Sequence, residues 1–311
     1  MGTSSPWSAR LLILSAAVLW SLSGVVLKGP AFDSLEEIPA NARGATVAGL
    51  RALFAALVLL PLVRPSRVRW RPGLVPMVFS FAAMSVLFIS ALMTTTAAAT
   101  IFLQYTSVVW ACLLGWLILK ERPGRPDVVA MACVVAGIGV ILSHDSGSML
   151  GNGLALASGV AYAGVVVSLR ALRNEDPVWL SFLNQAACAA VILPWMLVTP
   201  VALSGAQIGW IAFLGSVQLA LPYVLFSIGI RKIPAREASV LLLIEPLLNP
   251  LWVLLVWGEP ATFATWLGGV IILGGLFLRF AVAGDRPVPA APEVSPTPSP
   301  APTPASAAAS K

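Results

Sequence analysis

The hydrophobic pattern of the chain consists of long apolar runs separated by short polar connections. A helix that crosses a bilayer needs about 20 mostly apolar residues, because its backbone must satisfy its own hydrogen bonds where no water is present. Ten runs meet this requirement and predict an all-α integral membrane protein with ten transmembrane helices. They cover about residues 11–28, 46–63, 73–93, 97–119, 127–143, 152–170, 179–199, 207–230, 238–257 and 262–280.

The composition and the placement of the basic residues support this assignment and give it a direction. Only 10% of the residues are charged and the mean hydropathy is +0.90, whereas a soluble domain has about 25% charged residues. Of 19 Lys and Arg residues, only Lys28, Arg43 and Arg51 fall outside the segments that share one side of the membrane with the N-terminus. Basic residues gather on the cytoplasmic side, so both termini are predicted to be cytoplasmic.

The two halves of the chain resemble each other. Trp20 with Lys28 corresponds to Tyr162 with Arg170, and the run from Ala99 to Glu121 resembles the run from Ala238 to Glu259. A glycine-bearing apolar helix follows each run. Because each half has five spans, the second half enters the membrane from the opposite side, as in transporters built from inverted repeats. The predicted units are a cytoplasmic N-terminus (1–10), a first repeat (11–143), a second, inverted repeat (152–280) and a disordered Pro/Ala-rich cytoplasmic tail (282–311).

These features resemble the EamA-type branch of the drug/metabolite transporter superfamily. The resemblance covers residues 10–280 and rests on the ten spans, the aromatic residue in the first helix of each half, and the ends of two matching helices at Lys120–Glu121 and Gly258–Glu259. Within that branch the chain is most similar to bacterial amino-acid exporters, including those for aromatic amino acids and methionine. The resemblance implies an inner-membrane secondary transporter that exports small metabolites, with amino acids of broad specificity first.

Polar and aromatic residues within spans are candidates for substrate binding, because polar groups in a membrane cost free energy and are retained mainly for function. Trp20 and Tyr162 hold matching places in the two halves, where a pseudo-twofold axis would put them on opposite walls of one cavity. The predicted substrate-binding residues are Trp20, Met84, Phe88, Gln104, Tyr105, Tyr162, Gln218, Tyr223, Glu245 and Asn249.

Glu245 is the strongest of these candidates, as the only carboxylate well inside a span. Asn249 follows on the same helical face, and Pro246 and Pro250 each leave a backbone carbonyl without its helical partner. This cluster has the groups needed to bind an ammonium group or to carry a proton. A packing role for a protonated Glu245 is an equal alternative.

Arg51 is predicted to lie one and a half turns inside the second span. Three roles are open to it: its side chain extends to the membrane surface, pairs with acidic residues of the first loop, or attracts a substrate carboxylate. Extension to the surface is favoured, because long basic side chains near span ends reach the interface in this way.

Several classes of function lack the residues they need. The chain has no phosphate-binding loop, no lysine in the middle of a span, and a single histidine, so an enzyme, a cofactor and a metal site are not expected.

The expected partners are a small-molecule substrate and the lipid bilayer, without nucleic acid, and one chain is expected to function as a monomer. A proton-coupled multidrug or cation exporter, an uptake carrier, a channel and a membrane scaffold are the alternatives. The first helix has no acid near position 20, unlike the small multidrug members of the superfamily.

Overall fold

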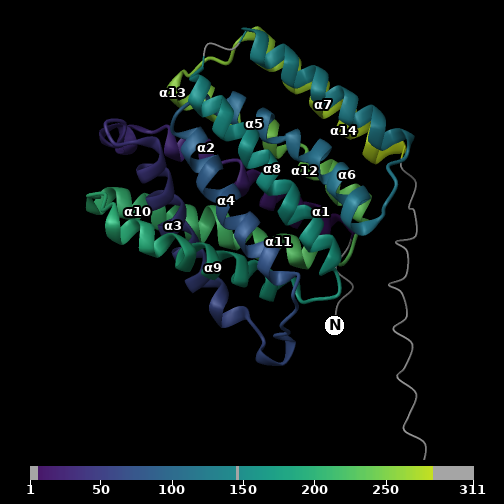
Figure 1. Cartoon of the computed structure of the whole chain (residues 1–311), viewed down its shortest axis with the longest axis horizontal. Coiled ribbons are helices and arrows are strands. Elements are labelled where there is room, and N and C mark those ends of the chain that lie inside the picture. The colour runs from purple at the N-terminus through teal and green to yellow at the C-terminus, as the bar shows by residue number, and fades with distance from the viewer. Residues whose placement is uncertain (1–5, 145–146, 283–311) are drawn as a thin grey trace, which may run out of the picture.

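A computed structural model describes residues 6–144 and 147–282 (Figure 1). Within these residues all regular secondary structure is helical. Ten candidate membrane spans lie within this described part of the chain, which confirms the predicted all-α transmembrane fold. Five spans are single α-helices: α4 (Leu74–Leu92), α7 (Arg125–His144), α8 (Met149–Ala171), α9 (Pro177–Val198) and α14 (Phe263–Val282). The second span consists of α3 (Ala40–Leu59) and a short 3-10 turn, η2 (Leu60–Leu62), that continues it. Apart from Val282, the predicted tail (282–311) lies outside the described residues.

The other four spans are interrupted. Span 1 consists of α1 (Pro6–Trp20) and α2 (Ser23–Leu27), span 4 of α5 (Ala97–Gln104) and α6 (Thr106–Leu119), and span 9 of α12 (Ala235–Leu242) and α13 (Glu245–Trp257). Span 8 joins α10 (Gly205–Phe213) to α11 (Leu221–Gly229) through a π-helical stretch, η4 (Leu214–Ala220). Pro222 in the first turn of α11 and Pro246 in the first turn of α13 account for two interruptions, because proline cannot donate the backbone hydrogen bond that a continuous helix requires.

Spans 4 and 9 are interrupted and terminated at corresponding places. Their breaks fall at Tyr105 and at Leu243–Ile244, which the alignment of the two halves superimposes. Both spans end in a residue with left-handed backbone conformation, Lys120 with φ 59° and Gly258 with φ 68°. These are the only residues with positive φ within the described ranges, 6–144 and 147–282. The two halves therefore share a local structure as well as a sequence pattern.

The first span of each half packs against spans of the other half. Span 1 packs against spans 8 and 9, and span 6, its counterpart, packs against spans 3 and 4. Spans 2 and 7 contact each other, as do spans 5 and 10, which lie side by side along one edge of the molecule as α7 and α14 (Figure 1). This exchange is what an inverted repeat would produce, and the inversion itself stays a prediction.

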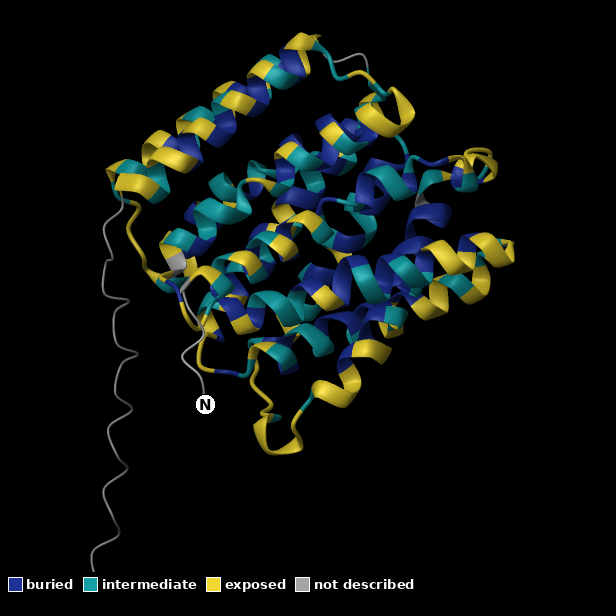
Figure 2. Cartoon of the chain, turned by 180° about the vertical axis from the view of Figure 1, so that it is seen from behind, coloured by how far each residue is buried: buried dark blue, intermediate teal, exposed yellow. Residues whose placement is uncertain are grey.

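The outer surface of the bundle suits a lipid environment. Figure 2 shows exposed residues on the outward sides of the peripheral helices and buried residues concentrated between them. Large apolar side chains are exposed near the middle of spans, at positions such as Leu53, Trp110, Val135 and Val270. In water such a surface would be unfavourable, whereas lipid chains cover it at no cost.

The two ends of the bundle differ in charge. The basic end carries the connections between spans 2 and 3, 4 and 5, 6 and 7, and 8 and 9; the Lys28 end carries the other connections. Among the described residues, every Lys and Arg except Lys28, Arg43 and Arg51 lies at the basic end. The assignment of the basic end to the cytoplasm remains a prediction from this asymmetry.

Candidate functional site at the interrupted spans

The interruption in span 1 is held by side chains from spans 8 and 9. Gln218 Nε2 donates to the Trp20 carbonyl oxygen at 2.8 Å, and Asn249 Nδ2 donates to Ser23 Oγ at 3.0 Å. Trp252 Nε1 donates to Ser21 Oγ, also at 3.0 Å. These contacts provide hydrogen bonds where the regular helical ladder is broken, which is necessary in a membrane.

Two of the predicted binding residues therefore have a structural role. The amide nitrogens of Gln218 and Asn249 are engaged with span 1, and only their oxygens, Oε1 and Oδ1, are buried without a partner. Gly24 lies so close to Asn249 Oδ1 that an added methyl group would collide with it. Sequence reasoning missed the matching hydroxyl and backbone groups of span 1, although serines beside a glycine in an apolar run could have suggested a break.

Glu245 lies at the start of α13, near the middle of its span. The three tyrosines of the chain, Tyr105, Tyr162 and Tyr223, lie close enough to interact electrostatically with the Glu245 carboxyl group. They come from spans 4, 6 and 8, so four spans meet at this group. We call these four residues the Glu245 group. Among the described residues, none forms an ion pair or hydrogen bond with the Glu245 carboxylate.

The aromatic rings of the predicted pair Trp20 and Tyr162 lie near Tyr223. The Trp20 and Tyr223 rings meet edge to face with centroids 5.3 Å apart, and the Trp20 and Phe226 centroids are 5.9 Å apart. Tyr162 interacts electrostatically with Tyr223, and 40% of its surface is accessible.

The remaining predicted residues lie in less polar surroundings. Met84 and Phe88 of α4 are partly buried and pack against an apolar cluster that includes Ile89 and Leu92. Gln104 ends α5 beside Tyr105, and its carbonyl oxygen lies close to Gly159 of α8. No polar contact links these three side chains to the Glu245 group, and their role in binding stays a prediction.

The favoured interpretation of Arg51 is wrong. The second span begins at Ala42, four residues earlier than predicted, so Arg51 lies nine residues inside it, about 14 Å along a helix. Its side chain is only 6% exposed, and Nε is buried without a hydrogen-bond partner. An arginine at mid-depth costs about 2.5–3.5 kcal/mol on insertion scales, and such residues are retained mainly for function.

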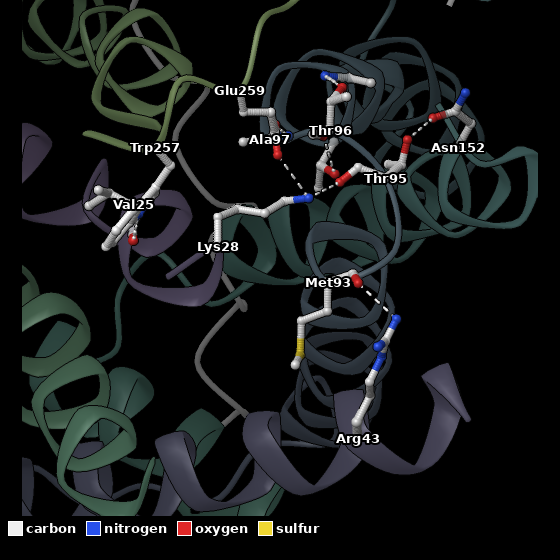
Figure 3. Close-up of polar contacts among 12 residues, drawn as sticks. Val25, Lys28, Arg43, Met93, Thr95, Thr96, Ala97, Asn152, Trp257 and Glu259 are labelled. Carbon is white, nitrogen blue, oxygen red and sulfur yellow. Dashed lines mark hydrogen bonds and ion pairs between the residues drawn. The ribbon is translucent and has the colours of Figure 1, made fainter. Parts of the chain in front are cut away.

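Ionic and hydrogen-bonded contacts link three spans at the Lys28 end of the bundle (Figure 3). Lys28 Nζ lies 3.0 Å from Glu259 Oε2 and donates to the Thr95 carbonyl oxygen at 2.6 Å. Glu259 Oε1 accepts from the Ala97 backbone nitrogen at 2.8 Å, at the positive N-terminal end of α5. The half-helices α2, α13 and α5 of spans 1, 9 and 4 are thereby tied together.

A second ion pair at the basic end joins residues at corresponding positions. Arg170 Nη1 lies 3.3 Å from Glu121 Oε2, and in the alignment of the two halves Arg170 corresponds to Lys28 and Glu121 to Glu259. Each pair joins the first span of one half to the fourth span of the other. Arg10 also pairs with Glu237 at the basic end.

The described residues offer no obvious metal site. Within residues 6–144 and 147–282, no group of three or more His, Cys, Asp or Glu residues lies close enough to hold a metal ion. The Glu245 group is instead suited to bind an organic ligand through one carboxylate, phenolic hydroxyls and aromatic faces.

Comparison with known proteins finds relatives that are named as transporters. The chain is 29% identical to an uncharacterized transporter of Archaeoglobus fulgidus, with 86% of this chain and 94% of that protein covered. It is 26% identical to the uncharacterized transporter YwfM of Bacillus subtilis (92% and 98% covered) and 25% identical to the uncharacterized inner membrane transporter YicL of Salmonella typhimurium (86% and 93% covered). One solved crystal structure has the same fold, with a TM-score of 0.61 at 18% identity over 90% of this chain and 98% of that chain.

The family assignment rests on both halves of the chain. The sequence profile of the EamA-like transporter family matches twice, over residues 7–143 and 149–281, so each predicted half carries one match. Together with the ten spans, these matches show a multi-pass membrane transporter. As the resemblance predicted, the chain belongs to the EamA-like transporter family.

Proposed function

We propose that the protein is a secondary carrier that exports small metabolites, with amino acids as the first candidates, by alternating access around the Glu245 group. The observation that carries this proposal is an unpaired mid-span carboxylate surrounded by three tyrosines from three other spans. Interrupted helices with polar groups near the middle of the membrane are typical of carriers that open alternately to each side.

The chemistry of the group fits an amino acid. The Glu245 carboxylate is an acceptor for an ammonium group, and the faces of Trp20 and Tyr223 attract a cation and pack against an apolar side chain. Tyrosine hydroxyls are donors for a carboxylate. Accessible aromatic surface, as at Tyr162, tolerates side chains of different shape, in accordance with a broad specificity.

The alternation can be described from the two ion pairs at corresponding positions. In this conformation the Lys28–Glu259 pair and its backbone contacts tie spans 1, 4 and 9 at the Lys28 end. In our proposal this end opens when these contacts break, while the Arg170–Glu121 pair, which is also formed in this conformation, continues to tie the counterpart spans at the basic end.

A proton-coupled exporter of cationic drugs is the second candidate, and the aromatic surroundings of Glu245 favour it. A cation needs only the carboxylate and the aromatic faces, and the same carboxylate is able to exchange a proton. An uptake carrier for another metabolite remains a further alternative, because the geometry of the site is independent of the direction of transport.

Vesicle transport with Glu245→Gln tests the proposal. We expect labelled aromatic amino acids and methionine to enter preloaded vesicles by exchange, and this flux to fall at least tenfold in Glu245→Gln at equal amounts of folded protein. Glu37→Gln, which neutralises an exposed loop carboxylate, should leave the flux unchanged. Unchanged flux in Glu245→Gln would return Glu245 to a packing role, and drug flux driven by a pH gradient without amino-acid flux would favour the second candidate.

A further inference from the structure

Arg51 is a buried cation that the Glu245 group does not account for. It lies in the middle of α3, and neighbouring protein covers all but 6% of its side chain. Its long side chain has no route to either membrane surface, because the span continues for about 14 Å or more on both sides. The charge must therefore be balanced where it lies.

No carboxylate of the described chain balances this charge. The ion pairs within residues 6–144 and 147–282 engage other cations, and Arg51 Nε has no hydrogen-bond partner. Buried guanidinium groups in proteins are normally paired with anions. A counter-ion from outside the chain, such as an anionic group of a ligand, would satisfy this requirement.

The surroundings of Arg51 supply further unused polar groups. Arg51 interacts electrostatically with Cys188 of α9 and with Tyr223 of the Glu245 group. Gln185, one turn before Cys188 on the same face of α9, is 1% exposed, and both its amide nitrogen and its amide oxygen lack partners. The side-chain oxygen of the adjacent Asn184 is also buried without a partner. Buried polar atoms without partners in a native structure call for a ligand or water.

Tyr223 connects this region to the candidate substrate site. It packs against a cluster that contains Ala55 of α3, one turn after Arg51, and it interacts electrostatically with both Arg51 and Glu245. Arg51 and Glu245 do not form an ion pair with each other among the described contacts. One positive and one negative group thus lie near the same tyrosine, and each is available to a ligand group of opposite charge.

We infer that Arg51 binds the anionic group of the transported substrate, which is a carboxylate if the proposed amino-acid transport holds, and that Gln185 assists it. Glu245 binds the ammonium group, and Tyr223 interacts with both subsites. The substrate class is therefore zwitterionic metabolites rather than simple cations. The inference rests on the proposed function for the identity of the substrate, whereas the anion subsite rests on the buried groups of α3 and α9.

Ligand-dependent melting of the purified full chain, followed by its tryptophan fluorescence, tests the two subsites separately. The probes are L-phenylalanine, phenethylamine, which lacks the carboxylate, and 3-phenylpropionate, which lacks the ammonium group. We expect Arg51→Gln to weaken binding of L-phenylalanine and 3-phenylpropionate at least tenfold and to leave phenethylamine binding within twofold of wild type. Glu245→Gln should show the opposite selectivity.

Arg43→Gln is the matched control, because Arg43 is the other buried arginine of α3 and donates to the carbonyl oxygens of Leu35 and Met93. It should lower the melting temperature without changing the ratio of 3-phenylpropionate to phenethylamine affinity. Arg51→Lys should retain part of the anion binding. If Arg51→Gln binds 3-phenylpropionate as well as wild type does, or loses all three probes equally while still folded, the inference is wrong.

Failure of the proposed function gives a different pattern. If L-phenylalanine binds through Arg51 but no amino acid crosses the vesicle membrane, the anion subsite stands and the transport proposal falls. If no amino acid binds, inorganic phosphate and citrate are the next probes, and stabilisation of wild type but not of Arg51→Gln still supports an anion subsite. Absence of an Arg51-dependent response to every anion overturns it.

Discussion

Asn249 connects the interrupted spans 1 and 9 through a single buried hydrogen bond to Ser23. We expect Asn249→Ala to lower the free energy of unfolding by about 1–3 kcal/mol, because it removes this bond and leaves the Ser23 hydroxyl without its partner. Unfolding of the purified protein measures this loss. In a double-mutant cycle with Ser23→Ala, the coupling energy should be about 0.5–1.5 kcal/mol. Additive effects of the two substitutions would show that the contact contributes nothing.

At the scale of residues, the sequence identified the polar residues within spans, but it did not predict which contacts their side chains make. Glu245 interacts electrostatically with Tyr105, Tyr162 and Tyr223, and the role of these four residues in binding stays a prediction. The engagement of Asn249 with span 1 was not predictable, because the rotation of one helix against another is set by packing between distant segments.

The interpretation of Arg51 failed for a more specific reason. An apolar run marks the hydrophobic part of a span, whereas α3 begins at Ala40 among small and polar residues. The helix therefore extends further towards the Lys28 end than the run does, and an arginine predicted near the end of the span lies in its middle. The ends of a span are less certain than its existence. Here the position of the span's first residue determined whether Arg51 was placed near the membrane surface or in the middle of the span.

At the scale of elements, the Lys28–Glu259 pair predicts a conformational change. Glu259→Gln removes the ionic contact with Lys28 and weakens the cap on α5. With spin labels at Glu37 and Met149, both exposed near the Lys28 end, we expect the inter-label distances measured by electron paramagnetic resonance to shift to longer values in Glu259→Gln. The native cysteines, Cys112, Cys133 and Cys188, are replaced first in the labelled protein.

The matched control lies at the opposite end of the bundle. Glu121→Gln removes the corresponding ion pair with Arg170 at the basic end and should leave the Glu37–Met149 distances unchanged. Equal lengthening in both variants would indicate general loosening of the bundle. No change in Glu259→Gln would show that the pair does not hold the Lys28 end closed.

The interruptions of the spans were only partly predictable. Pro246 marks the break in span 9, because its ring removes a backbone donor that the helix needs. The break in span 4 at Tyr105 has no proline and is accompanied by close contact with span 6, where Gly159 lies against the Gln104 carbonyl and Thr106. Such a break depends on tertiary contact, although comparison of the two halves could have placed it opposite the break in span 9.

At the scale of the whole molecule, the packing of spans between the two halves makes each half dependent on the other. Span 1 of the first half contacts spans 8 and 9, and span 6 contacts spans 3 and 4. A half expressed alone would lack the partners of its own first span. The number of spans and the family were predictable from hydropathy and from the similarity of the halves, whereas this exchange of partners required the structure.

The contact between α7 and α14 joins the last span of one half to the last span of the other, and it gives a whole-molecule prediction. A methyl group at Gly137 would collide with the Gly268 carbonyl oxygen, and one at Gly268 with the Gly137 carbonyl oxygen. Small residues let transmembrane helices approach this closely. Gly137→Ala should therefore cost about 1–3 kcal/mol of unfolding free energy through overpacking. Gly139, two residues away with no neighbour within 4 Å, is the matched control, and Gly139→Ala should be neutral or stabilise by about 0.5–1 kcal/mol because alanine favours the helix. Equal melting temperatures for the two variants would mean that these spans separate without penalty and that the contact does not stabilise the bundle.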